Sequence, residues 1–333
     1  MNRREFIQTS SLILPLMIDQ PATASSQNKL GIATTSYMGV WRPKDTYEFL
    51  EHCHSLGAAG IQAPLNGDLP KLRARAEELG MYIEGWAPMP HGNDTSGLEQ
   101  ALEHAKEANA VAVRTACLGT RRYETFSTYA DWQQFVGERN KSIEAALRVV
   151  DRYKIPLGIE NHKDWLADDL AAMLAKHASE YLGACLDFGN NISLLDDPMR
   201  VIEVLAPYTV STHLKDIAVA PGADGFLLSE VILGQGLLDL PRAISLVQQS
   251  RPKTRLSLEM ITRDPLDVPC LTDKYWATFP DRNGIYLART LRFVRDHQSR
   301  LPTISQLPHY EQLQTEEQNV IACLRYAHEK LDL

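Results

Sequence analysis

The sequence predicts a (β/α)₈ barrel, in which eight parallel strands alternate with helices. From Leu30 onward, eight short β-rich runs each precede a stretch with helical periodicity. The 333 residues suffice for one such barrel, for which about 250 are typical, although two domains of about 150 residues would also fit the length. A doubly wound open sheet is the alternative, but no G-x-G-x-x-G motif follows the first run.

The first 24 residues have the features of an export signal rather than of a folded element. Arg3 and Arg4 precede a short apolar run at residues 12–18, and the small residues Ala22-Thr23-Ala24 follow it. The adjacent arginines resemble a twin-arginine signal, so we expect cleavage after residue 24 and a periplasmic or secreted protein. Because the apolar run contains a proline and an aspartate borders it, a frayed N-terminus is the alternative.

Strands are expected where β-branched and aromatic residues gather between turn residues. In chain order they are Leu30 to Tyr37, Gly60 to Leu65, Met81 to Trp86, Ala110 to Ala116, Ile155 to His162, Tyr181 to Phe188, Thr209 to Ile217 and Thr254 to Ile261.

Helices are expected between these strands, with recognisable ends. Examples are Thr46 to Leu56, Leu69 to Leu79, Leu98 to Ala108 and Leu166 to Ala178. Gly57 and Gly80 stand where glycines end helices, and Asp197-Pro198 supplies a cap followed by a proline in the first turn.

Two segments interrupt the alternation and are expected at the active-site face of the barrel. Residues 217–236 hold too many turn signals for a helix and are interpreted as a long loop or hairpin, and residues 271–280 as a second long loop. An apolar stripe near the C-terminus predicts an extra helix packed on the barrel. We therefore expect a barrel over residues 25–300 and a C-terminal helical extension over residues 301–333.

Composition excludes several classes of protein. Hydrophobic residues make up 44% and charged residues 23%, as in soluble globular proteins. A net charge of −8 argues against nucleic-acid binding, and no apolar run is long enough to predict a membrane span. The five cysteines form no C-x-x-C motif, which makes a disulfide framework or a cysteine zinc site unexpected. The oligomeric state is left open, a homo-oligomer included.

Four of the predicted strands end with residue types that bind metals. Glu160, Asp187, His213 and Glu259 each come late in an otherwise apolar or small run, at intervals of 27, 26 and 46 residues. Because side chains alternate along a strand, all four can point inward, with small residues such as Ser211 and Ser257 in the layer below. Three carboxylates and an imidazole in one layer require a cation. Mostly oxygen ligands suit Mn²⁺ or Mg²⁺, with Co²⁺ and Zn²⁺ as alternatives.

These strand ends resemble the metal site of the xylose-isomerase-like barrels. The runs Ile-Glu-Asn-His, Leu-Asp-x-Gly-Asn, His-Leu-Lys-Asp and Leu-Glu are similar to those of the sugar phosphate isomerase/epimerase group. The resemblance implies one divalent ion held by Glu160, Asp187, His213 and Glu259, and it implies that Glu160 and Glu259 also form the acid/base pair. Two positions depart from characterised epimerases: Asn190 replaces a histidine, and Val219 replaces an arginine.

Five further residues are candidates for substrate binding. His162 and Lys215 each follow a ligand by two residues on the same face, although a structural hydrogen bond or an ion pair with Glu160 or Asp187 would explain them equally well. Asn190 takes the place of a family substrate contact. Trp86 and Trp276 could stack on sugar faces, with core packing as the alternative.

The expected function is a metal-dependent isomerase or epimerase that acts on a free sugar, polyol or keto-sugar through an enediolate. One glutamate would remove a proton and the other would return one. A lyase acting on oxidised (3-keto) glycosides is the first alternative, since proton removal would expel a leaving group on the neighbouring carbon. A non-catalytic sugar-binding barrel is the second.

Overall fold

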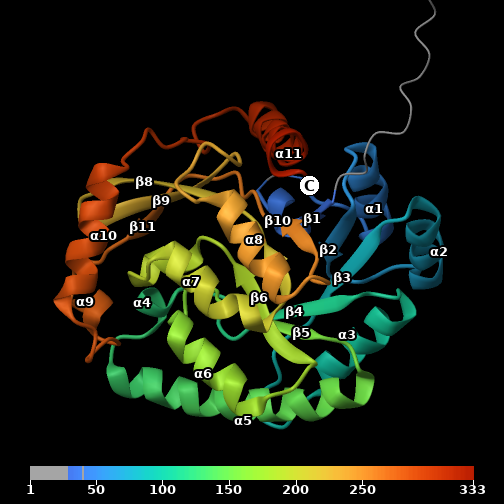
Figure 1. The fold of residues 1–333 in the computed structure, drawn as a ribbon, viewed down its shortest axis with the longest axis horizontal. Helices are drawn as coiled ribbons and strands as arrows, with labels where there is room; N and C mark the ends of the chain where they lie inside the picture. Colours follow the sequence, from blue (N-terminus) through green and yellow to red (C-terminus); the bar gives the residue numbers. More distant parts are fainter. Residues whose placement is uncertain (1–28, 40) are drawn as a thin grey trace, which may run out of the picture.

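The structure is a computed structural model that describes residues 29–39 and 41–333. Within that part, eight parallel strands stand side by side in one sheet, surrounded by helices (Figure 1). In sheet order the strands are β10 (Leu256–Leu258), β1 (Leu30–Ala33), β2 (Gly60–Ala63), β3 (Tyr82–Trp86), β4 (Ala112–Ala116), β5 (Leu157–Glu160), β6 (Leu182–Asp187) and β7 (Thr209–His213). A parallel bridge between Leu214 and Leu258 joins the two outer strands and completes the ring. The predicted (β/α)₈ barrel is confirmed, while the predicted export signal lies outside the described residues.

The helices cover the outside of the ring. They are α1 (Thr46–Ser55), α2 (Leu69–Leu79), α3 (Ser96–Glu107), α4 (Arg122–Thr125), α5 (Tyr129–Tyr153), α6 (Ala167–His177), α7 (Pro198–Leu205), α8 (Leu240–Ser250), α9 (Asp273–Trp276), α10 (Gly284–Asp296) and α11 (His309–Leu331). Short 3-10 turns lie at Thr34–Tyr37, Asn190–Leu194 and Ala206–Tyr208.

Helix ends follow the sequence signals closely. The Asp197 side chain accepts a hydrogen bond from the Arg200 amide at the start of α7, and Pro198 occupies the first turn. Gly80 ends α2 in a left-handed conformation, with φ of 67°, that costs glycine little because it has no Cβ. These caps determine where the two helices begin and end.

A small antiparallel sheet covers part of the barrel rim. It contains β8 (Asp216–Gly222), β9 (Gly225–Val231) and β11 (Leu266–Val268) in the order β11-β9-β8, so the hairpin interpretation of residues 217–236 is correct. A second apolar cluster, separate from the main core, packs this sheet against α9 and α10 (Figure 1). The segment 271–280, expected as a loop, contains the short helix α9, which the Thr272 side chain caps.

The C-terminal helix packs on the barrel as predicted. Val320, Cys323, Leu324 and Ala327 of α11 are buried in the main core. The hydroxyl of Tyr37 donates a hydrogen bond to Glu317 Oε2 at 2.8 Å, which ties α11 to the turn after β1. None of the described helices is both long and apolar enough to span a bilayer.

Candidate metal centre and active site

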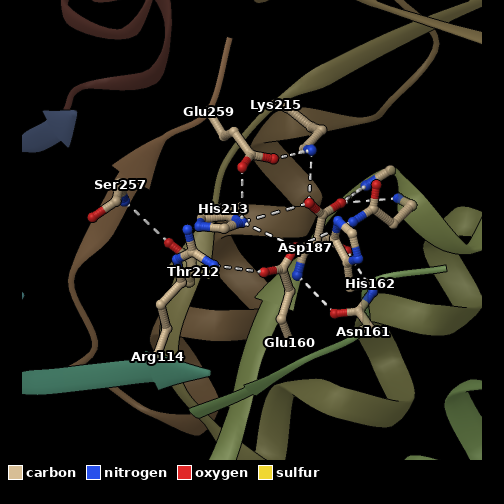
Figure 2. Close-up of polar contacts among 12 residues, drawn as sticks. Arg114, Glu160, Asn161, His162, Asp187, Thr212, His213, Lys215, Ser257 and Glu259 are labelled. Atoms are coloured by element: carbon tan, nitrogen blue, oxygen red, sulfur yellow. Dashed lines mark hydrogen bonds and ion pairs between the residues drawn. The ribbon is translucent and has the colours of Figure 1, made fainter. Parts of the chain in front are cut away.

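Four side chains from the carboxyl ends of neighbouring strands meet at one point (Figure 2). Glu160 ends β5, Asp187 ends β6, His213 ends β7 and Glu259 follows β10. All four are buried, and one ligand atom from each lies within 4.8 Å of all the others. The carboxyl ends of parallel barrel strands share one rim, which explains how residues spread over a hundred positions converge.

The imidazole of His213 presents its Nδ1 atom to the three carboxylates. Nδ1 lies 3.3 Å from Glu259 Oε1, 3.5 Å from Glu160 Oε1 and 3.7 Å from Asp187 Oδ2. It has no hydrogen-bond partner among the described residues. The other ring nitrogen, Nε2, lies 2.6 Å from Gln62 Oε1 and must donate to that oxygen. Nδ1 is therefore the ring nitrogen that can bind a metal, in place of a proton.

The electrostatics of the cluster favour a bound cation. Burial alone would lower the pKa of His213, but the Glu259 and Glu160 carboxylates outweigh it and raise the pKa to about 9. Three buried carboxylates thus attract a positive charge to the position of Nδ1. One divalent ion would supply that charge, and oxygen ligands with a single nitrogen match its preferences. The residues present fit one metal ion.

Two cations, the partly buried Arg114 and the buried Lys215, balance part of the carboxylate charge. Arg114 Nη1 lies 3.1 Å from Glu160 Oε2, and Lys215 Nζ lies 2.7 Å from Asp187 Oδ2 and also donates to Glu259. Burial alone would raise the pKa of Glu259, but His213 and Lys215 hold it well below its usual value. Lys215 thus makes an ion pair with Asp187, the alternative already recognised from the sequence, rather than with Glu160.

A buried polar layer supports the cluster from below. Gln62 Nε2 donates to Glu84 Oε2 at 2.9 Å, and the hydroxyls of Ser211 and Ser257 donate to the same oxygen at 2.9 and 3.2 Å. Burial raises the pKa of Glu84. This network holds the Gln62 amide, which in turn orients His213 and determines its tautomer.

The Gln62→Met variant tests this support. Methionine fills a similar volume but accepts no hydrogen bond from Nε2–H, so the imidazole loses its orienting partner. We expect metal affinity to fall about 10- to 100-fold, as for other residues that orient metal-bound histidines. Titration of metal-free protein with Mn²⁺ measures the change, and Gln134→Met at the exposed surface is the matched control. Equal affinities in both variants would contradict this role of Gln62.

A cavity of about 680 Å³ opens above the cluster. The two glutamates line it, together with Trp86, His162 and Asn190. Trp86 is 39% exposed, which leaves part of its ring open to the cavity. His162 Nδ1 lies 2.9 Å from the carbonyl of Leu118 and donates to it, which leaves Nε2 as an acceptor.

The remaining predicted substrate residues are placed differently. The Asn190 amide donates to Asp187 Oδ1 at 2.9 Å, and its side-chain Nδ2 lies 3.5 Å from Glu160 Oε1. Asn190 therefore supports two ligands while lining the cavity. Trp276 does not line it: its ring packs against Tyr275 and Phe279, and its Nε1–H donates to the carbonyl of Cys270. Core packing, the alternative interpretation, describes Trp276.

Several residues of the site were not predicted from the sequence. Gln62, Glu84 and Arg114 each stand inside an apolar stretch of β2, β3 or β4, and the alternation used for the later strands would have placed them inward. The cavity is also lined by Lys163 and Arg139, which lie outside the strands and gave no comparable signal. Asp216 of the His-Leu-Lys-Asp run is not a ligand. Its carboxylate accepts backbone hydrogen bonds from the loop after β9.

Comparison with known proteins identifies the relatives of this chain. It is 30% identical over 243 residues to 3-oxo-isoapionate decarboxylase of Pectobacterium atrosepticum, an alignment that covers 68% of this chain and 82% of that protein. The crystal structure of the IOLI protein with a bound zinc atom superposes with a TM-score of 0.56 at 13% identity, covering 90% of this chain and 99% of the other. D-psicose 3-epimerase of Clostridium cellulolyticum H10 with D-tagatose superposes with a TM-score of 0.54 at 14% identity, covering 80% and 97%.

Because their sequence identities are low, the structural matches establish a shared fold and no more. The sequence match agrees with a family model described as xylose isomerase-like TIM barrel, which covers residues 50–279. Those residues include β5, β6, β7 and β10, and with them all four side chains of the candidate metal centre. The chain belongs to the xylose isomerase-like TIM barrel family.

Proposed function

We propose that this chain is a divalent-metal-dependent enzyme that transfers a proton on a keto-sugar or polyol, with isomerisation or epimerisation as the net reaction. The observation that carries the proposal is the pairing of Glu160 and Glu259 around one buried imidazole, at 3.5 and 3.3 Å from its Nδ1, with both carboxylates lining the cavity. A proton removed at the cavity wall by one glutamate could therefore be returned by the other.

The two glutamates are equipped to act as bases. Burial tends to raise the pKa of Glu160, but His213, His162 and Arg114 lower it well below its usual value, so the carboxylate is ionised at neutral pH. A divalent ion, Mn²⁺ or Mg²⁺ with Co²⁺ or Zn²⁺ as alternatives, would acidify the carbon next to the substrate carbonyl and stabilise the enediolate charge. Trp86 and His162 would position the sugar against the glutamates.

A lyase is the second candidate, and the 30% match to a decarboxylase favours it. In a 3-oxo acid, cleavage of the bond to the carboxylate releases CO₂ and leaves the electron pair as an enolate. One proton from solvent, delivered by way of a glutamate, would then add to that carbon and complete the ketone product. Elimination from a 3-keto glycoside would use the same site, with proton removal by a glutamate followed by loss of the leaving group.

Turnover in D₂O distinguishes these reactions. Protein loaded with Mn²⁺ would be incubated with ketohexoses, 3-keto glycosides and 3-oxo sugar acids, and the products analysed by mass and NMR. An isomer that carries deuterium at the deprotonated carbon supports the isomerase or epimerase. A deuterated product that has lost CO₂, or a released aglycone with an unsaturated ketone, supports the lyase instead. If none of the three substrate classes gives deuterium exchange or a product, the proposal of an enzyme is refuted and the non-catalytic sugar-binding barrel becomes the remaining hypothesis.

A further inference from the structure

Lys163 is a buried cation in the wall of the candidate active site. The residue is 4% exposed and lines the same cavity as Glu160 and Glu259. The ammonium donates a hydrogen bond to Asn190 Oδ1, the residue that supports two of the metal ligands. It makes no ion pair with a carboxylate of residues 29–39 and 41–333, unlike the other buried lysine of the site, Lys215.

The arginines around the cavity show how unusual this is. Arg114 is paired with Glu160, Arg121 with Glu124, and Arg263 with Glu230 at 2.7 Å. Arg139 is the exception: it is 9% exposed, its Nε atom has no partner in the described chain, and its guanidinium lies 5.5 Å from the ring centre of Phe135. The cavity wall thus carries two buried positive charges that make no direct ion pair with a carboxylate in the described part of the chain.

The backbone at Lys163 is also uncommon. Its φ of +62° lies in the left-handed region, which a residue with a Cβ seldom occupies outside turns and functional sites. Burial, followed by the charge of Lys215, lowers the pKa of Lys163 to about 8. A buried ammonium without a carboxylate partner opposes folding. A binding role explains why it is there.

The charge balance of the site indicates the sign of the ligand. Three ligand carboxylates face the two cations Arg114 and Lys215, which leaves one excess negative charge. A divalent ion would turn this into one excess positive charge, and Lys163 and Arg139 would raise it to three. This excess favours an anionic substrate, such as one whose carboxylate is joined during the reaction by the charge of an enediolate or enolate.

We propose that the substrate is a sugar acid and that the ammonium of Lys163 binds its carboxylate, with Arg139 adding positive potential to the same wall. This inference rests on the proposed function, because it takes the cavity to be the substrate site. It narrows the free sugar or polyol expected from the sequence to a carboxylate-bearing sugar. One ammonium suits a carboxylate better than a phosphate dianion, which proteins usually bind with several donors.

Matched pairs of aldonates and alditols test the inference, because they differ only in the carboxylate. Calorimetry on Mn²⁺-loaded protein would compare D-gluconate with D-glucitol, D-galactonate with galactitol, and D-xylonate with xylitol. We expect at least one aldonate to bind about tenfold or more tightly than its alditol, the size of a charge-assisted hydrogen bond. Lys163→Met should remove the preference, Lys163→Arg should restore part of it, and Lys141→Met at the exposed surface should preserve it.

Thermal stability separates binding from a structural role. Because Lys163→Met removes a buried charge that has no directly paired carboxylate, we expect an unchanged or higher Tm in the absence of ligand, whereas loss of a structural hydrogen bond would lower it. The inference is overturned if no aldonate binds more tightly than its alditol, or if the preference survives in Lys163→Met, which would indicate carboxylate binding to the metal. Tighter, Lys163-dependent binding of D-glucitol 6-phosphate would overturn the choice of a carboxylate.

Failure of the proposed function gives a different result. Binding is measured without turnover, so a Lys163-dependent aldonate preference without deuterium exchange would refute the enediolate chemistry and keep the sugar-acid site. Exchange on neutral ketohexoses, without any aldonate preference, would keep the chemistry and refute the site.

Discussion

Glu160→Gln and Glu259→Gln are each expected to reduce turnover by about 10²- to 10⁴-fold, the range for loss of a general acid or base. Glutamine keeps the shape of the side chain and an oxygen for the metal but has no basicity. Both carboxylates line the cavity and lie within 3.5 Å of His213 Nδ1. Each is therefore held at its own position in the site, and we expect neither to take over the proton transfer of the other. Deuterium incorporation should fall in parallel with turnover.

The matched control is Glu107→Gln, at an exposed position of α3, which should turn over at the wild-type rate. Metal content and Tm must be measured for both site variants, because Glu160→Gln also deprives Arg114 of its carboxylate partner. Full activity in either variant, with the metal retained, would contradict the paired acid/base assignment.

Asp187→Ala and His213→Ala are expected to abolish metal binding. The wild-type protein should hold about one divalent ion per chain, since the described residues contain one such cluster of four buried ligands. Losing one of four ligands weakens binding, and removing Asp187 also frees the ammonium of Lys215. Elemental analysis of purified protein gives the stoichiometry, and His54→Ala on the surface of α1 is the matched control.

Stability provides the second measurement of the same prediction. An ion that binds only the folded state raises the free energy of unfolding by RT ln(1 + [M]/Kd), which is about 2.7 kcal/mol when the free ion is at a hundredfold excess over Kd. Adding Mn²⁺ should therefore raise the Tm of the wild-type and His54→Ala proteins and leave that of the two ligand variants unchanged. Full metal occupancy in both Asp187→Ala and His213→Ala would refute the four-ligand centre.

The ligand set was predictable because strand geometry is local. Alternation along each strand put Glu160, Asp187, His213 and Glu259 on the inward face, and parallel strands bring their carboxyl ends to one rim. The same rule, applied to β2, β3 and β4, would also have found Gln62, Glu84 and Arg114. For Trp276 the sequence offered two interpretations, and packing of α9 against the second apolar cluster decided between them.

The sequence by itself determined the barrel, the C-terminal helix and the four candidate ligands, because periodicity, caps and strand parity act over a few residues. The tertiary structure alone decided which charges are paired. Lys215 forms ion pairs with Asp187 and Glu259, and Arg263 forms one with Glu230. Lys163 and Arg139 form none with a carboxylate of the described residues. These ion pairs join side chains from distant segments, which come together only when the barrel closes. The free energy of a buried charge therefore depends on the tertiary structure, because it depends on whether the charge is paired.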